Sequence, residues 1–174
     1  AMPHLAYIGL GTNLCCGQYT DRQQQLHNNL NKAIHALQEQ IGTLLKCSSF
    51  VSTKPWGFAS ENTFLNAAAS FRTELTPQQL LSTTQDIEIK MGRTAKSHDC
   101  QYQDRIIDID ILFYDDMTLS TPDLTIPHPQ INIRSFVLQP LAEIAPYYLH
   151  PTLHKTIAQL LEELQGKTYN QNNH

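Results

Sequence analysis

The sequence predicts an α+β fold, in which helices pack on a mostly antiparallel sheet. The first observation is a set of short apolar segments of strand length, and the second is a pair of amphipathic helical patterns between them. The third is their order, because residues 4–113 run strand, helix, strand, strand, helix, strand. This is the order of a ferredoxin-like sandwich, and further strand and helix elements follow it towards the C-terminus.

The composition is that of a globular protein of one domain. Of the 174 residues, 41% are hydrophobic and 16% are charged. No apolar run approaches the ~20 residues that a membrane span needs, and no signal peptide opens the chain, in which Ala1 before Met2 is typical of a residue left by cloning. We therefore expect a cytoplasmic protein with a single domain over residues 1–166 and a frayed tail over residues 167–174.

Charge and cysteine content exclude two classes of protein. The formal net charge of -4 argues against a nucleic-acid binder that works by neutralising phosphates. The four cysteines show no CxxC spacing, so we expect reduced thiols rather than a disulfide framework.

The first half of the chain supplies most of the expected sheet. Residues 4–10 predict a strand that ends in a glycine-containing turn, and Gly11 to Asn13 would allow close backbone approach. Asp21 is a good cap for the helix that follows, which should end at Gly42. Residues 43–53 and 64–73 predict two strands of a hairpin, separated by a loop that holds the single tryptophan.

The second half begins with a helix and ends with one. Thr76 and Pro77 open a helix that should end at Gly92, and residues 93–104 lack apolar periodicity, as is typical of a long loop. After the strand at residues 105–113, the sequence predicts a turn, a short return strand at residues 117–120 and an extended segment at residues 124–129. Residues 134–145 predict short helical structure. A last helix should start at Pro151 or Thr152, with a frayed polar tail from Gly166.

Two aspartates interrupt the strand at residues 105–113. The strand period places Ile107, Ile109, Ile111 and Phe113 on one face, and Ile106, Asp108, Asp110 and Leu112 on the other. Residues two apart on a strand project roughly 6 to 7 Å apart, close enough to share one or two cations. A divalent cation with oxygen ligands would relieve their repulsion. The alternative is a solvated strand face that carries two ordinary aspartates.

Other candidate residues are weaker when each is taken alone. The chain has neither GxxxxGK[ST] nor GxGxxG, so any phosphate site would depend on metal and on the nearby cations Arg93, Lys96, Arg105 and Arg134. His128 lies between two prolines, which fix its direction, although an isolated histidine is more often structural or exposed than catalytic. His150 and His154 have the spacing of helical zinc ligands, but Pro151 separates them and no third ligand is evident. Trp56, Phe64 and Phe136 could stack on a flat heterocycle or belong to the core.

Six motifs in order resemble the 6-hydroxymethyl-7,8-dihydropterin pyrophosphokinase family of folate biosynthesis. The resemblance covers nearly the whole chain. Its motifs are YIGLGTNL at residues 7–14, TKPWG at 53–57, FLNA at 64–67, Ile87-Glu88 with Gly92-Arg93, RIIDIDI at 105–111, and LTIPH at 124–128 with Arg134 and Phe136.

The resemblance implies transfer of pyrophosphate from ATP to the pterin hydroxymethyl group, with release of AMP. Two Mg²⁺ ions would lie between Asp108, Asp110 and the phosphates, with Arg93 and Arg105 as catalytic arginines. The family's pterin-binding positions match Thr53, Pro55, Trp56, Gly57, Phe64, Asn66 and Phe136. Its ATP-binding positions match Gln85, Glu88, Arg93, Lys96, Tyr102, Arg105, Thr125, His128 and Arg134.

One departure from the family lies just before Arg105, where Gln103-Asp104 replaces the Gly-Pro of many members. The substrates are small molecules, and we expect a monomer with neither nucleic acid nor membrane as a partner. Two other functions fit parts of the sequence. One is a metal-dependent phosphohydrolase on the same aspartates, and the other is a non-catalytic ferredoxin-like binding module.

Overall fold

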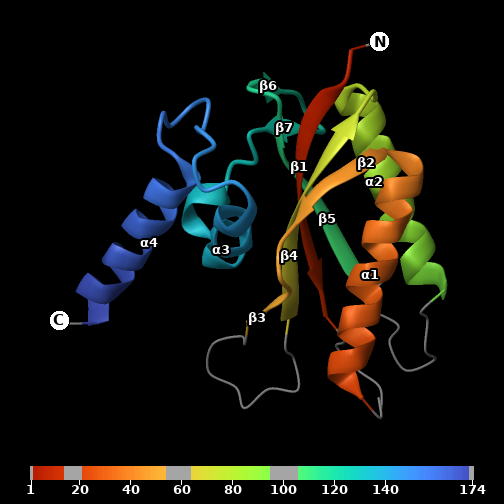
Figure 1. The fold of residues 1–174 in the computed structure, drawn as a ribbon, viewed down its shortest axis with the longest axis horizontal. Helices are drawn as coiled ribbons and strands as arrows, with labels where there is room; N and C mark the ends of the chain where they lie inside the picture. Colours follow the sequence, from red (N-terminus) through yellow and green to blue (C-terminus); the bar gives the residue numbers. More distant parts are fainter. Residues whose placement is uncertain (1, 14–20, 54–63, 95–105, 173–174) are drawn as a thin grey trace.

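The computed structural model describes residues 2–13, 21–53, 64–94 and 106–172 (Figure 1). Its main sheet is built around β1 (His4–Thr12), which pairs with β4 (Phe64–Thr73) on one side and with β5 (Ile107–Tyr114) on the other. Both β2 (Gly42–Cys47) and β3 (Val51–Thr53) pair with β4, and all of these pairings are antiparallel. The strand order β2-β4-β1-β5 confirms the predicted ferredoxin-like sheet.

Helices lie on both sides of this sheet. Figure 1 shows α1 (Arg22–Gln40) and α2 (Pro77–Thr94) on one side, and α3 (Ser135–Ile144) and α4 (Ile157–Asn172) on the other. Each side has its own apolar core. Ile8, Leu30 and Phe71 belong to the first, and Leu112, Leu138 and Ile157 belong to the second.

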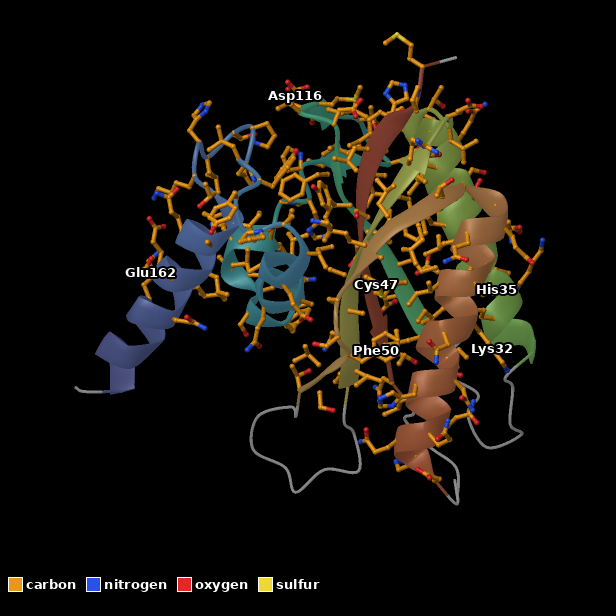
Figure 2. All side chains as sticks on the ribbon, in the orientation of Figure 1. Lys32, His35, Cys47, Phe50, Asp116 and Glu162 are labelled. Atoms are coloured by element: carbon orange, nitrogen blue, oxygen red, sulfur yellow. The ribbon has the colours of Figure 1, made fainter. Side chains whose placement is uncertain are left out.

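The first helix shows how the sequence sets an element. Asp21 caps α1 by accepting a hydrogen bond from the backbone N–H of Gln24 at 3.0 Å. Leu26, Leu30 and Leu37 recur at helical spacing and are buried against the sheet. Lys32 and His35 are exposed on the outer side of the same helix (Figure 2). The helix therefore separates an apolar stripe from a wet face, as predicted.

A bulge in β5 redirects its last residues. The register against β1 shifts between Tyr7 and Ile8, so Leu112 and Phe113 both pack in the core beneath α3 and α4. The simple alternation had placed Phe113 with Ile111, and this prediction was wrong because period-two counting cannot detect an inserted residue.

Several element bounds also differ from the prediction. The single strand expected over residues 43–53 is two strands, and the helix expected to end at Gly92 continues to Thr94. The last helix begins at Ile157 rather than at residue 151 or 152, because a hydrogen-bonded turn occupies that position. The tail expected to be frayed is helical as far as Asn172.

A small hairpin follows the main sheet. It pairs β6 (Leu119–Ser120) with β7 (Thr125–Ile126), and the Ile126–Pro127 peptide bond is cis. A 3₁₀ turn, η1 (Ile131–Ile133), leads from it into α3. None of the helices in the described ranges combines the length and apolar character of a membrane span.

Candidate active site

The two aspartates lie side by side on the face of β5 that is turned away from α1 and α2. Ile107, Ile109 and Ile111 are buried on the opposite face, which confirms this part of the predicted split. Asp108 is exposed and Asp110 is half-buried. Both carboxylates therefore border solvent rather than the core.

Glycines face the aspartates across the strand pair. Gly11 of β1 is the register partner of Asp108, and Gly9 is the partner of Asp110. On its other side Gly11 pairs with Asn66 of β4, so one row across the sheet reads Asn66, Gly11, Asp108. Because the middle strand has no side chains here, the surface between the amide and the carboxylate stays open.

His128 lies beside the half-buried aspartate. Its backbone N–H donates to the Leu112 carbonyl at 3.0 Å, which fixes the segment after β7 along β5. Burial lowers the pKa of His128 below its ordinary value. Asp110 acts on the pKa in the opposite direction, and Arg134 lowers it further. Both charged groups therefore lie within electrostatic range of the His128 ring.

Arg134 extends this group to an aromatic side chain. Its guanidinium carbon lies 5.6 Å from the centroid of the Phe136 ring, a cation–π arrangement, and the guanidinium also donates to the Gln130 amide oxygen. Phe136 remains 37% exposed, so its ring has surface left for another contact. Charged and aromatic residues thus form one continuous group from Asp110 to Phe136.

The predicted pterin-binding residues of β3 and β4 are also close to one another. The Asn66 amide is buried and donates to the Thr53 hydroxyl at 3.1 Å. Phe64 pairs with Thr53 across the strands and is 37% exposed. The Glu143 carboxylate of α3 accepts from both the backbone and the hydroxyl of Ser49 at 2.8 Å, which ties the helix that carries Phe136 to the segment before β3.

The α2 residues behave differently from one another. Gln85 is exposed, whereas Glu88 is 6% exposed and accepts a hydrogen bond from the backbone N–H of Ile109 at 3.2 Å. Glu88 therefore holds the strand between the two aspartates. The sequence pattern gave no sign of this contact. Thr125 is exposed on β7, on the hairpin that precedes His128.

Several predicted residues lie outside the described part of the chain. They are Pro55, Trp56, Gly57, Lys96, Tyr102 and Arg105, together with the Gln103-Asp104 step. The backbone of Arg93 belongs to α2, but its side chain is outside the described set.

A zinc site at His150 and His154 finds no support. Within the described ranges, no group of three or more His, Cys, Asp or Glu side chains could hold a metal ion. Nδ1 of His150 instead accepts hydrogen bonds from the backbone N–H groups of Thr152 and Leu153. Cys47, the one cysteine within the described residues, is a free thiol exposed on β2 (Figure 2).

The chain is similar to known proteins over most of its length. A family model described as 7,8-dihydro-6-hydroxymethylpterin-pyrophosphokinase (HPPK) matches residues 7–146. A 2-amino-4-hydroxy-6-hydroxymethyldihydropteridine pyrophosphokinase of Porphyromonas gingivalis is 45% identical over 148 residues, which cover 84% of this chain and 94% of that protein. A protein of the same name from Aquifex aeolicus is 35% identical and covers 90% of each chain.

Solved structures agree on the fold. The wild-type HPPK-DHPS of Plasmodium falciparum superposes with a TM-score of 0.78 at 18% sequence identity. The match covers 99% of this chain but 47% of the Plasmodium chain, so this chain spans about half the length of that protein. At this identity the likeness shows the fold alone. With the family model and the two pyrophosphokinases, it establishes that the chain belongs to the 7,8-dihydro-6-hydroxymethylpterin pyrophosphokinase family.

Proposed function

We propose that this chain transfers the pyrophosphoryl group of ATP to the hydroxymethyl group of 6-hydroxymethyl-7,8-dihydropterin. In that reaction the hydroxyl oxygen bonds to the β-phosphorus of ATP and loses its proton. The bond from the β-phosphorus to the oxygen that bridges to the α-phosphorus breaks, and AMP leaves. The observation that carries the proposal is the group of neighbouring side chains Asp110, His128, Arg134 and Phe136. This group connects a candidate phosphate-binding site with an exposed aromatic ring.

Asp108 and Asp110 are suited to hold Mg²⁺. Their donors are hard carboxylate oxygens on one strand face, and Gly11 opposite Asp108 leaves room for substrate oxygens and water to complete an octahedral set. Two aspartates are too few ligands to enclose an ion, which suits a metal that is shared with ATP phosphates. Magnesium bound there would neutralise charge on the transferring group, and we expect two ions.

The chain's own residues would position both reactants. We assign the pterin to the space bordered by Phe64 and Phe136, with Asn66, Thr53 and the 55–57 segment towards its hydrogen-bonding edge. Half-exposed rings on β4 and α3 suit a flat bicyclic ligand. The Asn66 amide is already oriented by Thr53, so it would lose little freedom when the pterin binds.

The nucleotide side rests on the cations and on His128. Nδ1 of His128 accepts the backbone N–H of Gln130 at 3.3 Å, so its Nε2 carries the proton and can donate to a phosphate oxygen. Arg134 supplies positive charge next to it. We assign Arg93, Lys96 and Arg105 to the triphosphate as well, and Gln85, Glu88, Tyr102 and Thr125 to the nucleotide. We further propose that the enzyme acts as a monomer in the cytoplasm.

Product analysis tests this proposal directly. Purified protein with Mg²⁺, ATP and the hydroxymethylpterin should form AMP and the pterin pyrophosphate in equal amounts. Release of inorganic phosphate without pterin modification would indicate a phosphohydrolase instead. Formation of no product with any nucleotide would contradict the assignment.

Asparagine variants of the two aspartates test the metal-binding role. Asp108→Asn and Asp110→Asn keep the side-chain shape but remove the charge, so each should lower AMP formation by roughly a hundredfold or more. Asp123→Asn is the matched control, because Asp123 is exposed after the β6 strand, outside the proposed site. Full turnover in either site variant would contradict the role.

A further inference from the structure

Two hydrogen bonds join α3 to the segment between β2 and β3. The Glu143 carboxylate accepts from the backbone N–H of Ser49 through Oε1 and from the Ser49 hydroxyl through Oε2, each at 2.8 Å. After burial, the charge of Glu143 is the second cause that raises the pKa of the Cys47 thiol, so the carboxylate lies within electrostatic range of the end of β2. A carboxylate that accepts two bonds from one residue holds both partners in one geometry. Neither Glu143 nor Ser49 has a role in the proposed reaction.

The neighbouring Ser48 fixes the sheet end of this contact. Ser48 is buried, and its backbone N–H donates to the Ala68 carbonyl of β4 at 2.9 Å. Its hydroxyl accepts the backbone N–H of Ala68 at 2.9 Å and donates to the Ser49 carbonyl at 2.8 Å. Ser49 therefore sits at a fixed place beside β4, and Glu143 is the group that α3 brings to it.

The helix end of the contact belongs to an element that is otherwise held by apolar packing. α3 packs on β4, and its Leu138 and Leu141 share a core cluster with Ala68 (Figure 1). Apolar burial is non-directional, so it specifies the rotation of the helix and its position along the strand less sharply than a hydrogen bond does. The bonds from Glu143 supply that directional restraint.

Rotation of α3 decides where Phe136 points. Phe136 and Glu143 are seven residues apart, close to two full turns, so they lie on the same side of α3 and roughly 10 Å apart along its axis. Pro140 lies between them and cannot donate to the Phe136 carbonyl. Leu138 and Leu141, on either side of Pro140, are both fully buried, so one core holds both turns. A restraint at Glu143 therefore bears on the orientation of the Phe136 ring.

We propose that Glu143 is a positioning residue for the substrate, because its contact with Ser49 sets the spacing between the ring of Phe136 on α3 and the sheet. Ser49 lies four residues before Thr53, the register partner of Phe64, so the contact connects the two walls of the space assigned to the pterin. A flat bicyclic ring stacks between two aromatic side chains only when both are at van der Waals distance, so a small shift of one wall weakens binding. This inference depends on the proposed function, since it takes the ligand of this space to be the pterin.

Two variants of Glu143 separate geometry from charge. The hydroxymethylpterin is titrated calorimetrically with Mg²⁺ and a non-hydrolysable ATP analogue present, and the analogue is titrated separately with Mg²⁺. The contact borders solvent, so Glu143→Ala should raise the Kd of the pterin by about fivefold and leave that of the analogue within about twofold. Glu143→Gln should bind the pterin as the wild type does, because its amide can accept the Ser49 N–H and donate to the Ser49 hydroxyl. Equal pterin affinity of wild type and Glu143→Ala, or an equal loss in Glu143→Gln, would overturn the proposal.

Glu163→Ala is the matched control. Glu163 is an exposed carboxylate on the neighbouring helix α4, where its Oε1 lies 2.7 Å from Nζ of Lys155. Its removal also deletes one negative charge and one polar contact, but the contact does not join the two walls, so the Kd of the pterin should stay within about twofold of the wild type. A rise equal to that in Glu143→Ala would overturn the proposal, because it would show a general effect of charge or stability.

Ser49→Ala tests the same contact from its other side. It removes the hydroxyl and keeps the backbone N–H, so the Kd of the pterin should rise by about twofold. In the Glu143→Ala background the same substitution should have no further effect, because its partner is already gone. Additive losses would overturn the proposal by showing that Glu143 does not act through Ser49.

The wild-type titration distinguishes failure of this inference from failure of the proposed function. If the wild type binds the pterin and Glu143→Ala binds it equally well, this inference alone is overturned. If the wild type binds no pterin in any nucleotide state, the proposed function is overturned and this inference with it.

Discussion

Individual residues on β1 decide how much space the site has. A Cβ atom added at Gly11 would lie 3.0 Å from Oδ1 of Asn66, whereas one added at Gly9 would lie 3.3 Å from the Leu112 side chain. Gly11 therefore leaves the space that the Asn66 amide occupies, and this amide is proposed to bind the pterin. The glycine-rich turn motif in the sequence predicted a close approach here, but not which group makes it.

Gly11→Ala should weaken pterin binding more than ATP binding. The new methyl group would push the Asn66 amide away from its contact with Thr53, and loss of one oriented hydrogen bond corresponds to about a tenfold rise in the Kd of the pterin. Calorimetric titration of the pterin, with Mg²⁺ and an ATP analogue present, measures this change. Gly9→Ala is the control, and its Kd for the pterin should stay within about twofold of the wild type because the added methyl group meets Leu112 and not the Asn66 amide. An equal loss in both variants would point to general damage to β1.

At the scale of elements, the sequence predicted what local patterns encode. The alternation in β5 from Ile107 to Ile111 and the Asp21 cap of α1 are properties of neighbouring residues, and both are confirmed. The bulge at Leu112 and the contact from Glu88 to Ile109 arise from packing between segments distant in the chain. Period counting has no access to such contacts, and the same holds for the proximity of His128 to Asp110.

In the C-terminal helix, packing of the first turns overrides the weak helix propensity of the residues that follow. Gly166 and its polar neighbours predicted a frayed tail, yet α4 continues through them to Asn172. Ile157 and Leu160 anchor the first turns of this helix in the second core, which extends the helix beyond what composition favours. Glu162 lies on the outer side of α4 (Figure 2) and is exposed, so the helix presents a polar face to water.

Gly166→Ala should stabilise the protein, because residue 166 lies inside α4. No atom lies within 4 Å of a Cβ added there, so the methyl group meets no obstacle. Alanine is favoured over glycine inside a helix by about 0.8 to 1 kcal/mol, so the midpoint temperature of thermal unfolding should rise by roughly 2 to 4 °C. A melting curve unchanged or lowered by the substitution would show that the tail is frayed, as the sequence alone predicted.

At the scale of the whole molecule, the two faces of the sheet differ in how completely helices and core residues cover them. The α1–α2 face is closed mainly by apolar residues, with Glu88 buried among them, whereas the α3–α4 face is closed over Ala68 and Leu112 and accessible at Phe64 and Asp108. Stability and function thus occupy different regions of one sheet. Of the residues that the family motifs assign to the site, Phe64 and Asp108 lie in the accessible region, next to the face that α3 and α4 cover.

Acid should destabilise the whole fold through the buried His150 and the half-buried His128. Burial is the main cause that lowers the pKa of both His128 and His150 below 6.5. Between each lowered pKa and 6.5, the unfolded chain binds more protons than the folded one, so the free energy of unfolding falls as pH decreases through this window. Urea unfolding measured from about pH 7 down to about pH 5 should show this decline in the free energy of unfolding.

Carboxylates contribute to the decline at the lower end of this pH range, so the informative quantity is the difference in slope between variants. His150→Asn should flatten the slope. His154→Asn should flatten it less, because His154 contributes only the smaller of the two causes that lower the pKa of His150. Parallel slopes in all three proteins would mean that His150 is protonated as readily in the folded state as in the unfolded one.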